Sequence, residues 1–125
     1  MKKNINTAKA PAAIGPYSQA IEASPFVYTS GMLGIDPSDG QLKGDIYAQA
    51  EQALKNLSEL LKEAGLSMDD IIKTTVFITD MACFSGVNEI YAKYFAAPYP
   101  SRSCVEVSKL PKGASIEIEA IALKK

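Results

Sequence analysis

Isolated charged residues stand in two apolar stretches near the end of the chain. Residues 100–107 read PSRSCVEV and carry Arg102, while residues 115–123 read SIEIEAIAL and carry Glu117 and Glu119. A guanidinium can meet a carboxylate with two parallel hydrogen bonds. A partly desolvated carboxylate has a raised pKa and can accept a proton from water. These residue types are therefore suited to anion binding and to acid–base chemistry.

Residue counts and spacing exclude several other catalytic centres. The chain contains no histidine, which removes the Ser-His and Cys-His pairs of nucleophilic catalysis. Its two cysteines, Cys83 and Cys104, form no CxxC pair and have no histidine with which to complete a zinc set. We therefore expect neither a metal site nor a dithiol redox centre, and two free thiols fit a reducing compartment.

The composition is that of an ordinary globular protein. Hydrophobic residues make up 47% and charged residues 22% of the 125 residues, so we expect one folded domain spanning residues 1–125. Thirteen basic residues against 14 acidic ones leave no surplus positive charge for nucleic acid. No apolar run approaches the roughly 18 residues of a membrane span, and the start lacks the apolar core of a signal peptide. The expected location is the cytoplasm.

Apolar spacing predicts two helices. Residues 45–64 carry small and aliphatic side chains three and four positions apart, and Gly65 follows where a left-handed C-terminal cap belongs. Residues 83–95 repeat the pattern before Pro98 and Pro100 prevent its continuation.

Four stretches rich in β-branched and aromatic residues predict strands, at residues 25–31, 71–79, 102–108 and 115–123. Turn residues at 36–41 suit a hairpin in which Gly40 takes a positive φ, and residues 110–115 similarly join the last two strands. The expected fold is α/β, of the α+β type, with a single mixed sheet and both helices on one face.

Strand alternation predicts on which face of the sheet the charges lie. In the third stretch Arg102 faces away from Val105 and Val107, and these valines suit the helix layer. In the last stretch Glu117 and Glu119 face away from the isoleucines. Both sets of charges are therefore expected on the face opposite the helices.

Periodicity leaves two interpretations of that face open. It can be simply wet, as one side of many antiparallel sheets is, with Arg102 paired to a glutamate on another strand. Alternatively, another subunit covers it and the charges line a cleft between chains.

Four segments carry a resemblance that covers essentially the whole chain. They are IGPYSQA (14–20), TSGMLGIDP (29–37), VNEIYAKYF (87–95) and PSRSCVEVSKLPKGASIEIEAIAL (100–123). They resemble the RidA family of reactive-intermediate deaminases, also called the YjgF family. The most specific part is the arginine-bearing strand followed, after a short Leu-Pro-Lys turn, by the Ile-Glu-Ile-Glu strand.

The resemblance implies a chorismate-mutase-like fold without mutase activity, assembled as a homotrimer with three equivalent sites between subunits. It also implies hydrolysis of small 2-imino acids and their enamine tautomers, such as 2-aminoacrylate, 2-iminopropanoate and 2-iminobutanoate, to 2-oxo acids and ammonia. No cofactor, nucleic acid or membrane is expected to take part.

By the same resemblance, Arg102 binds the substrate carboxylate and Glu117 holds the hydrolytic water, aided by Cys104. Glu119 is instead expected to form an ion pair at the trimer interface or on the surface. Because both glutamates share a face, the sequence alone does not choose between them. Cys104 has no base nearby to generate a thiolate, which favours packing and water positioning over nucleophilic attack.

The remaining expected binding residues come from three other segments. Tyr17 matches an aromatic residue that closes over the ligand from an N-terminal loop. Ser30 and Gly31 match a strand end that approaches the substrate, where a side chain at position 31 obstructs binding. Asn88 matches a polar residue near the site, or is an exposed helix position. Met32 departs from the family pattern, in which glutamine commonly follows the Ser-Gly pair, and this bears on substrate range.

Two functions of different classes follow. The first is an imine deaminase that uses Glu117 and water on a substrate anchored by Arg102. The alternative is a non-catalytic trimer that binds small 2-oxo acids as a sensor or scavenger and uses Arg102 but not Glu117. Ribonuclease activity, also attached to the family, is disfavoured by the acidic composition.

Overall fold

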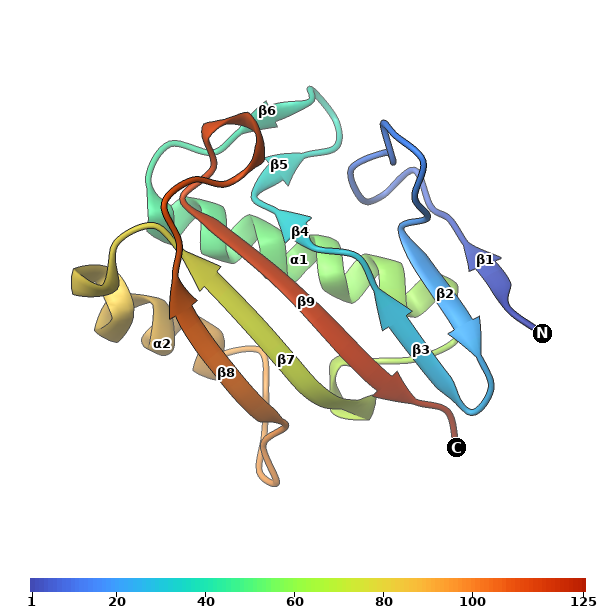
Figure 1. Ribbon diagram of the computed structural model, residues 1–125. Coiled ribbons are helices and arrows are strands. Elements are labelled where there is room, and N and C mark those ends of the chain that lie inside the picture. Colours follow the sequence, from blue (N-terminus) through green and yellow to red (C-terminus); the bar gives the residue numbers. More distant parts are fainter.

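The computed structural model describes residues 1–125 and contains a seven-stranded mixed sheet with two α-helices behind it (Figure 1). The order across the sheet is β1-β2-β3-β9-β7-β8, with β4 pairing to β9 beyond the end of β3. The strands are β1 (Lys3–Ile5), β2 (Ala20–Ala23), β3 (Phe26–Thr29), β4 (Met32–Leu33), β7 (Ile71–Ile78), β8 (Ser101–Glu106) and β9 (Ile116–Leu123). The predicted α+β architecture is confirmed.

The helices begin and end where their residues provide caps. In α1 (Ile46–Glu63) the Asp45 carboxylate accepts a hydrogen bond from the Ala48 N–H at the first turn. Gly65 takes φ +77° after the last turn, and the Leu66 N–H donates to the Leu61 carbonyl. The second helix, α2 (Phe84–Ala92), ends before the predicted Phe95 because residues 93 and 94 form a turn.

The core lies between α1 and the sheet, since α1 packs on β9 and β4. Its aliphatic stripe meets the alternating buried residues of β9 and β7. The largest fully buried apolar side chains are Leu54, Leu57, Leu60, Leu61, Ile78, Ile116, Ile118, Val27 and Val76. None of the helices combines the length and apolar composition needed to cross a bilayer.

Several pairings were outside the reach of the sequence pattern. The short strands β1 and β2 were not predicted, although β2 forms a hairpin with β3. The 36–41 turn does join a hairpin, between β5 (Ile35–Asp36) and β6 (Gln41–Leu42), and Gly40 has φ +74°.

The final two strands are not neighbours, in contrast to the simple turn expected at 110–115. Strand β7 lies between them, antiparallel to β9 and parallel to β8. The parallel pairing follows from the chain connection, because α2 carries the chain from the end of β7 back to the start of β8. Residues 110–115, with the 3₁₀ turn Pro111–Gly113, therefore pass over the end of β7 (Figure 1).

The face predicted for Arg102 is wrong, whereas that for Glu117 is confirmed. Arg102 is in register with Thr74, which is fully buried on the helix side, so Arg102 faces the helix layer. Val105 instead lies on the open face and is 42% exposed. Glu117 pairs with Phe77 on that open face. Strand β8 is a short edge strand, and the contacts of Arg102 with α2 decide which of its residues face the helices. The hydrophobic pattern alone therefore predicted the wrong face for Arg102 and Val105.

Candidate active site

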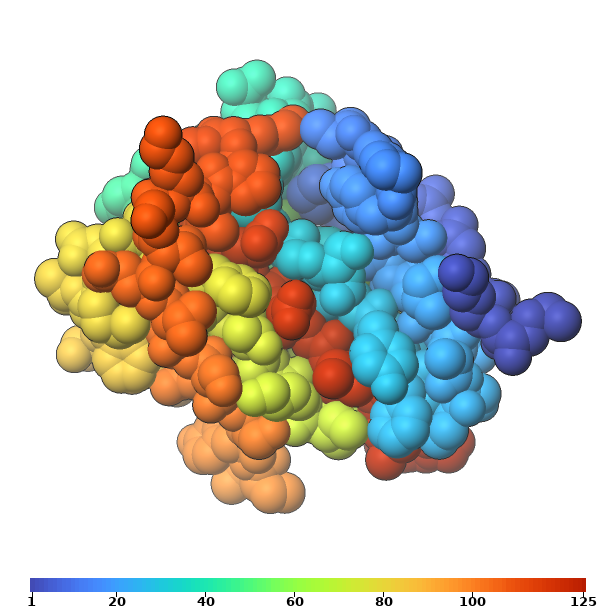
Figure 2. Space-filling model, viewed as in Figure 1, coloured from blue at the N-terminus to red at the C-terminus, as the bar shows by residue number.

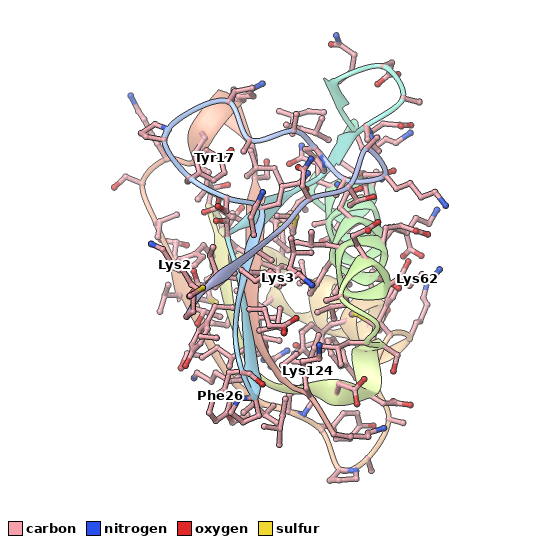
Figure 3. All side chains as sticks on the ribbon, turned by 90° about the vertical axis from the view of Figure 1, so that its right-hand side faces the viewer. Lys2, Lys3, Tyr17, Phe26, Lys62 and Lys124 are labelled. Atoms are coloured by element: carbon pink, nitrogen blue, oxygen red, sulfur yellow. The ribbon has the colours of Figure 1, made fainter.

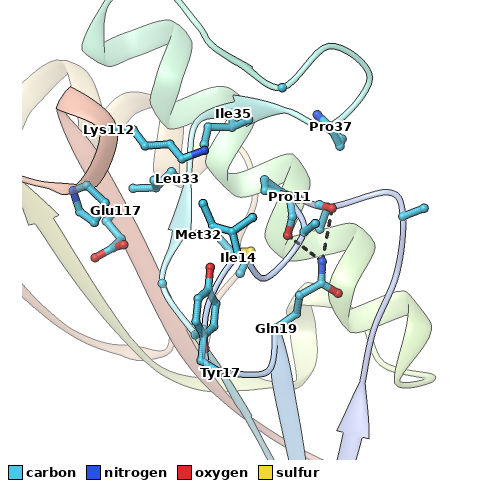
Figure 4. Close-up of a pocket in the computed structure, with 17 residues that line it drawn as sticks. Pro11, Ile14, Tyr17, Gln19, Met32, Leu33, Ile35, Pro37, Lys112 and Glu117 are labelled. Carbon is cyan, nitrogen blue, oxygen red and sulfur yellow. Dashed lines mark hydrogen bonds between the residues drawn. The ribbon is translucent and has the colours of Figure 1, made fainter.

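A pocket of about 750 Å³ opens on the face of the sheet that the helices do not cover. It lies between the N-terminal segment and the 110–113 turn, where Figure 2 shows a recess. Four residues predicted for the site line it: Tyr17, Ser30, Gly31 and Glu117. The rest of its wall is mostly apolar and includes Ala8, Ala10, Pro11, Ala12, Ile14, Met32, Leu33, Ile35, Pro37 and Pro111 (Figure 4).

Glu117 is the one carboxylate that lines this pocket. Burial raises the pKa of its carboxyl, and the neighbouring charge of Glu119 raises it further. No hydrogen bond or cation within the chain lowers this pKa, so the carboxylate can accept a hydrogen bond from a bound molecule. Glu119 is exposed, whereas Glu117 is half-buried and lines the pocket. The geometry therefore favours Glu117 over Glu119 as the functional carboxylate.

Glycine at position 31 is required by the Glu117 side chain. A Cβ atom on Gly31 would lie 2.5 Å from the Glu117 carboxyl carbon, so any larger residue would push the carboxylate out of place. Next to it, the Ser30 hydroxyl donates to the Ser18 carbonyl at 2.7 Å, and the Ser30 N–H donates to the Gln19 carbonyl at 2.9 Å. Both Ser30 donors thus fasten the base of the N-terminal loop.

Tyr17 projects from that loop on the open side of the sheet, whereas Lys62 marks the helix side (Figure 3). Tyr17 is 51% exposed and lines the pocket. Its backbone N–H donates to the Gly15 carbonyl at 2.8 Å, which tightens the turn that presents the ring. An exposed aromatic ring at a pocket mouth can cover a bound small molecule.

Arg102 belongs to a second cluster, on the helix side of β8. Its Nη1 donates to Asn88 Oδ1 at 2.6 Å, and its guanidinium lies 4.8 Å from the centre of the Tyr91 ring and 5.4 Å from that of Phe84. The Tyr91 hydroxyl is in turn bonded to buried Thr74 at 2.7 Å. No carboxylate of the chain pairs with Arg102, in contrast to the cross-strand ion pair considered above. The guanidinium is held in place with donors left for an anion.

Tyr91 and Phe84 were not predicted as site residues. They lie three positions after and four positions before Asn88, on the same face of α2. That spacing was the available signal, but it is equally typical of core packing.

Cys104 lies two residues after Arg102 on the same face of β8. Burial raises the pKa of its thiol, and the positive charge of Arg102 offsets only part of this effect. The sulfur is therefore protonated at neutral pH, which agrees with a packing role.

We predict that Cys104→Ser keeps much of the activity, because a hydroxyl can keep the expected contact with the hydrolytic water while removing any thiolate route. Steady-state rates of the variant and of Cys83→Ser, which changes the other free cysteine, provide the comparison. A loss in Cys104→Ser as large as that caused by removing Arg102 would instead indicate covalent chemistry at the sulfur.

Within one chain the two clusters do not meet. Arg102 and Glu117 point to opposite faces of the sheet and are separated by β7. Their registers differ by three residues, so their backbones are about 10 Å apart across the strands and about 10 Å along them. The chain therefore carries two separate clusters: Arg102, Asn88 and Cys104 on one face, and Tyr17, Gly31 and Glu117 on the other.

Comparisons with known proteins show which family the chain belongs to. The family model described as Endoribonuclease L-PSP matches residues 7–124. The mouse protein named 2-iminobutanoate/2-iminopropanoate deaminase is 51% identical over 99% of this chain and 93% of its own length. A protein of Escherichia coli K12 named putative reactive intermediate deaminase TdcF is 47% identical, over 99% of this chain and 98% of its own.

Solved structures of other proteins have the same fold as this chain. RidA from an Antarctic Psychrobacter superposes with a TM-score of 0.95 at 43% identity, covering 97% of this chain and 98% of that one. E. coli TdcF with bound serine also gives 0.95, at 46% identity, covering 98% of this chain and 99% of that one. The fold, the motifs and these similarities over nearly the full length show that the chain belongs to the RidA family.

Proposed function

We propose that this protein is a cofactor-independent enzyme that hydrolyses small 2-imino acids, and the enamines in equilibrium with them, to 2-oxo acids and ammonia. The observation that carries the proposal is the pair of clusters, one presenting an unpaired, preorganised guanidinium and the other a carboxyl with a raised pKa in an apolar pocket. The related mouse protein is named for this chemistry.

The residues support a simple sequence of bond changes. Arg102 binds the substrate carboxylate, and Tyr17 covers the pocket. Glu117 accepts a proton from a water molecule as the water oxygen bonds to C2 of the protonated imine. The π electron pair of the C=N bond moves to nitrogen. In the resulting carbinolamine the Glu117 proton passes to nitrogen and the C2–N bond breaks, which releases ammonia. The C2 hydroxyl becomes the carbonyl by giving its proton to the Glu117 carboxylate, from which the departing ammonia takes it as ammonium. Water supplies the oxygen, and no electron acceptor is needed.

The two clusters act on one substrate only if they come from different copies of the chain. The open face supports such assembly, because it exposes large apolar side chains, among them Tyr28 and Val105. The proposed assembly is a homotrimer in which each of three sites combines Arg102 of one subunit with Glu117 of the next.

We predict that mixing two inactive variants restores activity. In trimers formed at random from equal amounts of Arg102→Ala and Glu117→Gln chains, about a quarter of the sites combine an intact arginine with an intact glutamate. Activity should therefore recover to about a quarter of the wild-type level after subunit exchange, with light scattering showing three copies.

Mixing Arg102→Ala with Arg102→Gln is the control, because no site then regains the guanidinium. An active monomer at low micromolar concentration, or no recovery from the complementary pair, would contradict the shared site.

The pH dependence of turnover should report Glu117. Because burial raises the pKa of this carboxyl, turnover should rise with pH through an apparent pKa above the ordinary glutamate value. Below that pKa the carboxyl is protonated and cannot accept the water proton. Glu119→Gln removes the second cause of the shift and should move this acid limb to lower pH. An acid limb that stays unmoved in Glu119→Gln and persists in Glu117→Gln belongs to another group.

The function itself is tested by a coupled assay. A dehydratase generates 2-aminoacrylate, and pyruvate release is followed with and without catalytic amounts of this protein. We expect acceleration proportional to its concentration. Unaccelerated release, together with calorimetric binding of 2-oxobutanoate, would support the non-catalytic binder instead.

A further inference from the structure

Gln19 is a buried polar residue for which the proposed mechanism has no use. Its side chain is 1% exposed, and it sits just before β2, at the end of the N-terminal loop. A fully buried amide is stable only when its donors and acceptor are hydrogen-bonded. All of its partners belong to the loop at residues 7–11, which is 8 to 12 positions earlier in the chain.

The amide makes a set of bonds that closes this loop on itself. Gln19 Oε1 accepts from the Thr7 N–H at 2.7 Å. Gln19 Nε2 donates to the carbonyls of Pro11 at 2.7 Å, Thr7 at 3.1 Å and Ala10 at 3.3 Å. Figure 4 shows the side chain reaching toward Pro11 at the edge of the pocket, which Gln19 also lines.

Few other hydrogen bonds hold residues 7–16 of the loop in place. Residues 6–19 contain no helix or strand. Apart from Gln19, the only side chain that bonds the backbone of residues 7–16 is that of Thr7, which accepts from Lys9 N–H. Yet the loop supplies one wall of the pocket, made of Ala8, Ala10, Pro11, Ala12, Ile14 and Tyr17.

We infer that Gln19 is a positioning residue of the active site: its amide fixes residues 7–17 as the wall that carries Tyr17 and so sets the affinity for substrate. The inference rests on the proposed function. Gln19 touches no substrate in this scheme, and it acts through the loop. Without the amide, one N–H and three carbonyls lose their partner and the loop can leave the sheet.

The test compares Gln19→Met with the wild type. Methionine has similar length and no hydrogen-bonding amide, so KM and the dissociation constant of 2-oxobutanoate should rise at least about 10-fold, while kcat falls less. Gln19→Asn keeps the amide one methylene short and should fall between the two. If Gln19→Met does not fold, the same measurements are made on Gln19→Asn.

A second measurement needs no substrate. Lys9 is exposed while Ala10 is buried, so trypsin can cut between them only when the loop opens. Mass spectrometry measures the rate of cleavage after Lys9. We expect this rate to be at least about 10-fold higher in Gln19→Met than in the wild type. The control for a general loss of stability is Ile71→Ala, which truncates a buried residue at the far end of β7 from the Glu117 register.

The outcomes separate the possibilities. Slow cleavage and unchanged affinity in Gln19→Met would overturn the inference, and so would equal effects in Ile71→Ala, which would make the change one of stability alone. If the wild type fails to hydrolyse imines while Gln19→Met still speeds cleavage at Lys9, the proposed function is wrong, but the inference that the Gln19 amide fixes the loop is supported.

Discussion

Arg102→Ala should nearly abolish imine hydrolysis and 2-oxo acid binding while leaving the assembled protein folded. The substrate's constant feature is its carboxylate. Arg102 is the one arginine of the chain, and no carboxylate of the chain pairs with it. Losing a charge-assisted pair in a site that excludes water removes on the order of 2 to 4 kcal/mol. That corresponds to a loss of about 30- to 1,000-fold in affinity or transition-state stabilisation.

The surroundings of Arg102 explain why lysine is a poor replacement. The guanidinium lies over Tyr91 and is directed by Asn88, so its plane is set before substrate arrives. Arg102→Lys keeps the charge but lacks the planar fork, and should recover only a small part of the activity. Asn88→Ala keeps the fork but loosens it, and should cost less than Arg102→Ala.

Steady-state hydrolysis and calorimetric titration with 2-oxobutanoate measure both effects, after circular dichroism has shown that each variant is folded. A folded Arg102→Ala variant with wild-type turnover and affinity would falsify the mechanism, because Arg102 would then be only a packing partner of α2.

Glu117→Gln should reduce turnover by about 100- to 10,000-fold, the usual contribution of a positioned acid–base group. Glutamine has nearly the same shape and can still hydrogen-bond a water molecule, but it cannot accept a proton. Binding of 2-oxobutanoate should therefore change much less than turnover. The expected result is a loss in kcat with a nearly unchanged dissociation constant.

Glu119→Gln is the matched control, since it makes the same chemical change two residues along the same strand face. Glu119 is exposed and does not line the pocket, so its variant should mainly affect assembly or stability. The reverse pattern, with turnover lost in Glu119→Gln and kept in Glu117→Gln, would assign the water to Glu119.

The sequence by itself determined the elements whose signals are local. The 3.6-residue apolar period of α1 and the glycine after its end are set by neighbours within one or two turns, and both appear where predicted. The four main strands are confirmed for the same reason. Family membership was also readable, because the arginine and glutamate strands with their connecting turn form a specific motif.

Tertiary structure decided how those elements pair and which way their residues face. A strand's partner is chosen by contacts far along the chain, so no local pattern placed β7 between β8 and β9. The side of Arg102 depended on the ring and amide that α2 supplies. Gln19 gave no sequence signal for its role, since the carbonyls it binds are backbone groups and only the fold brings them to it.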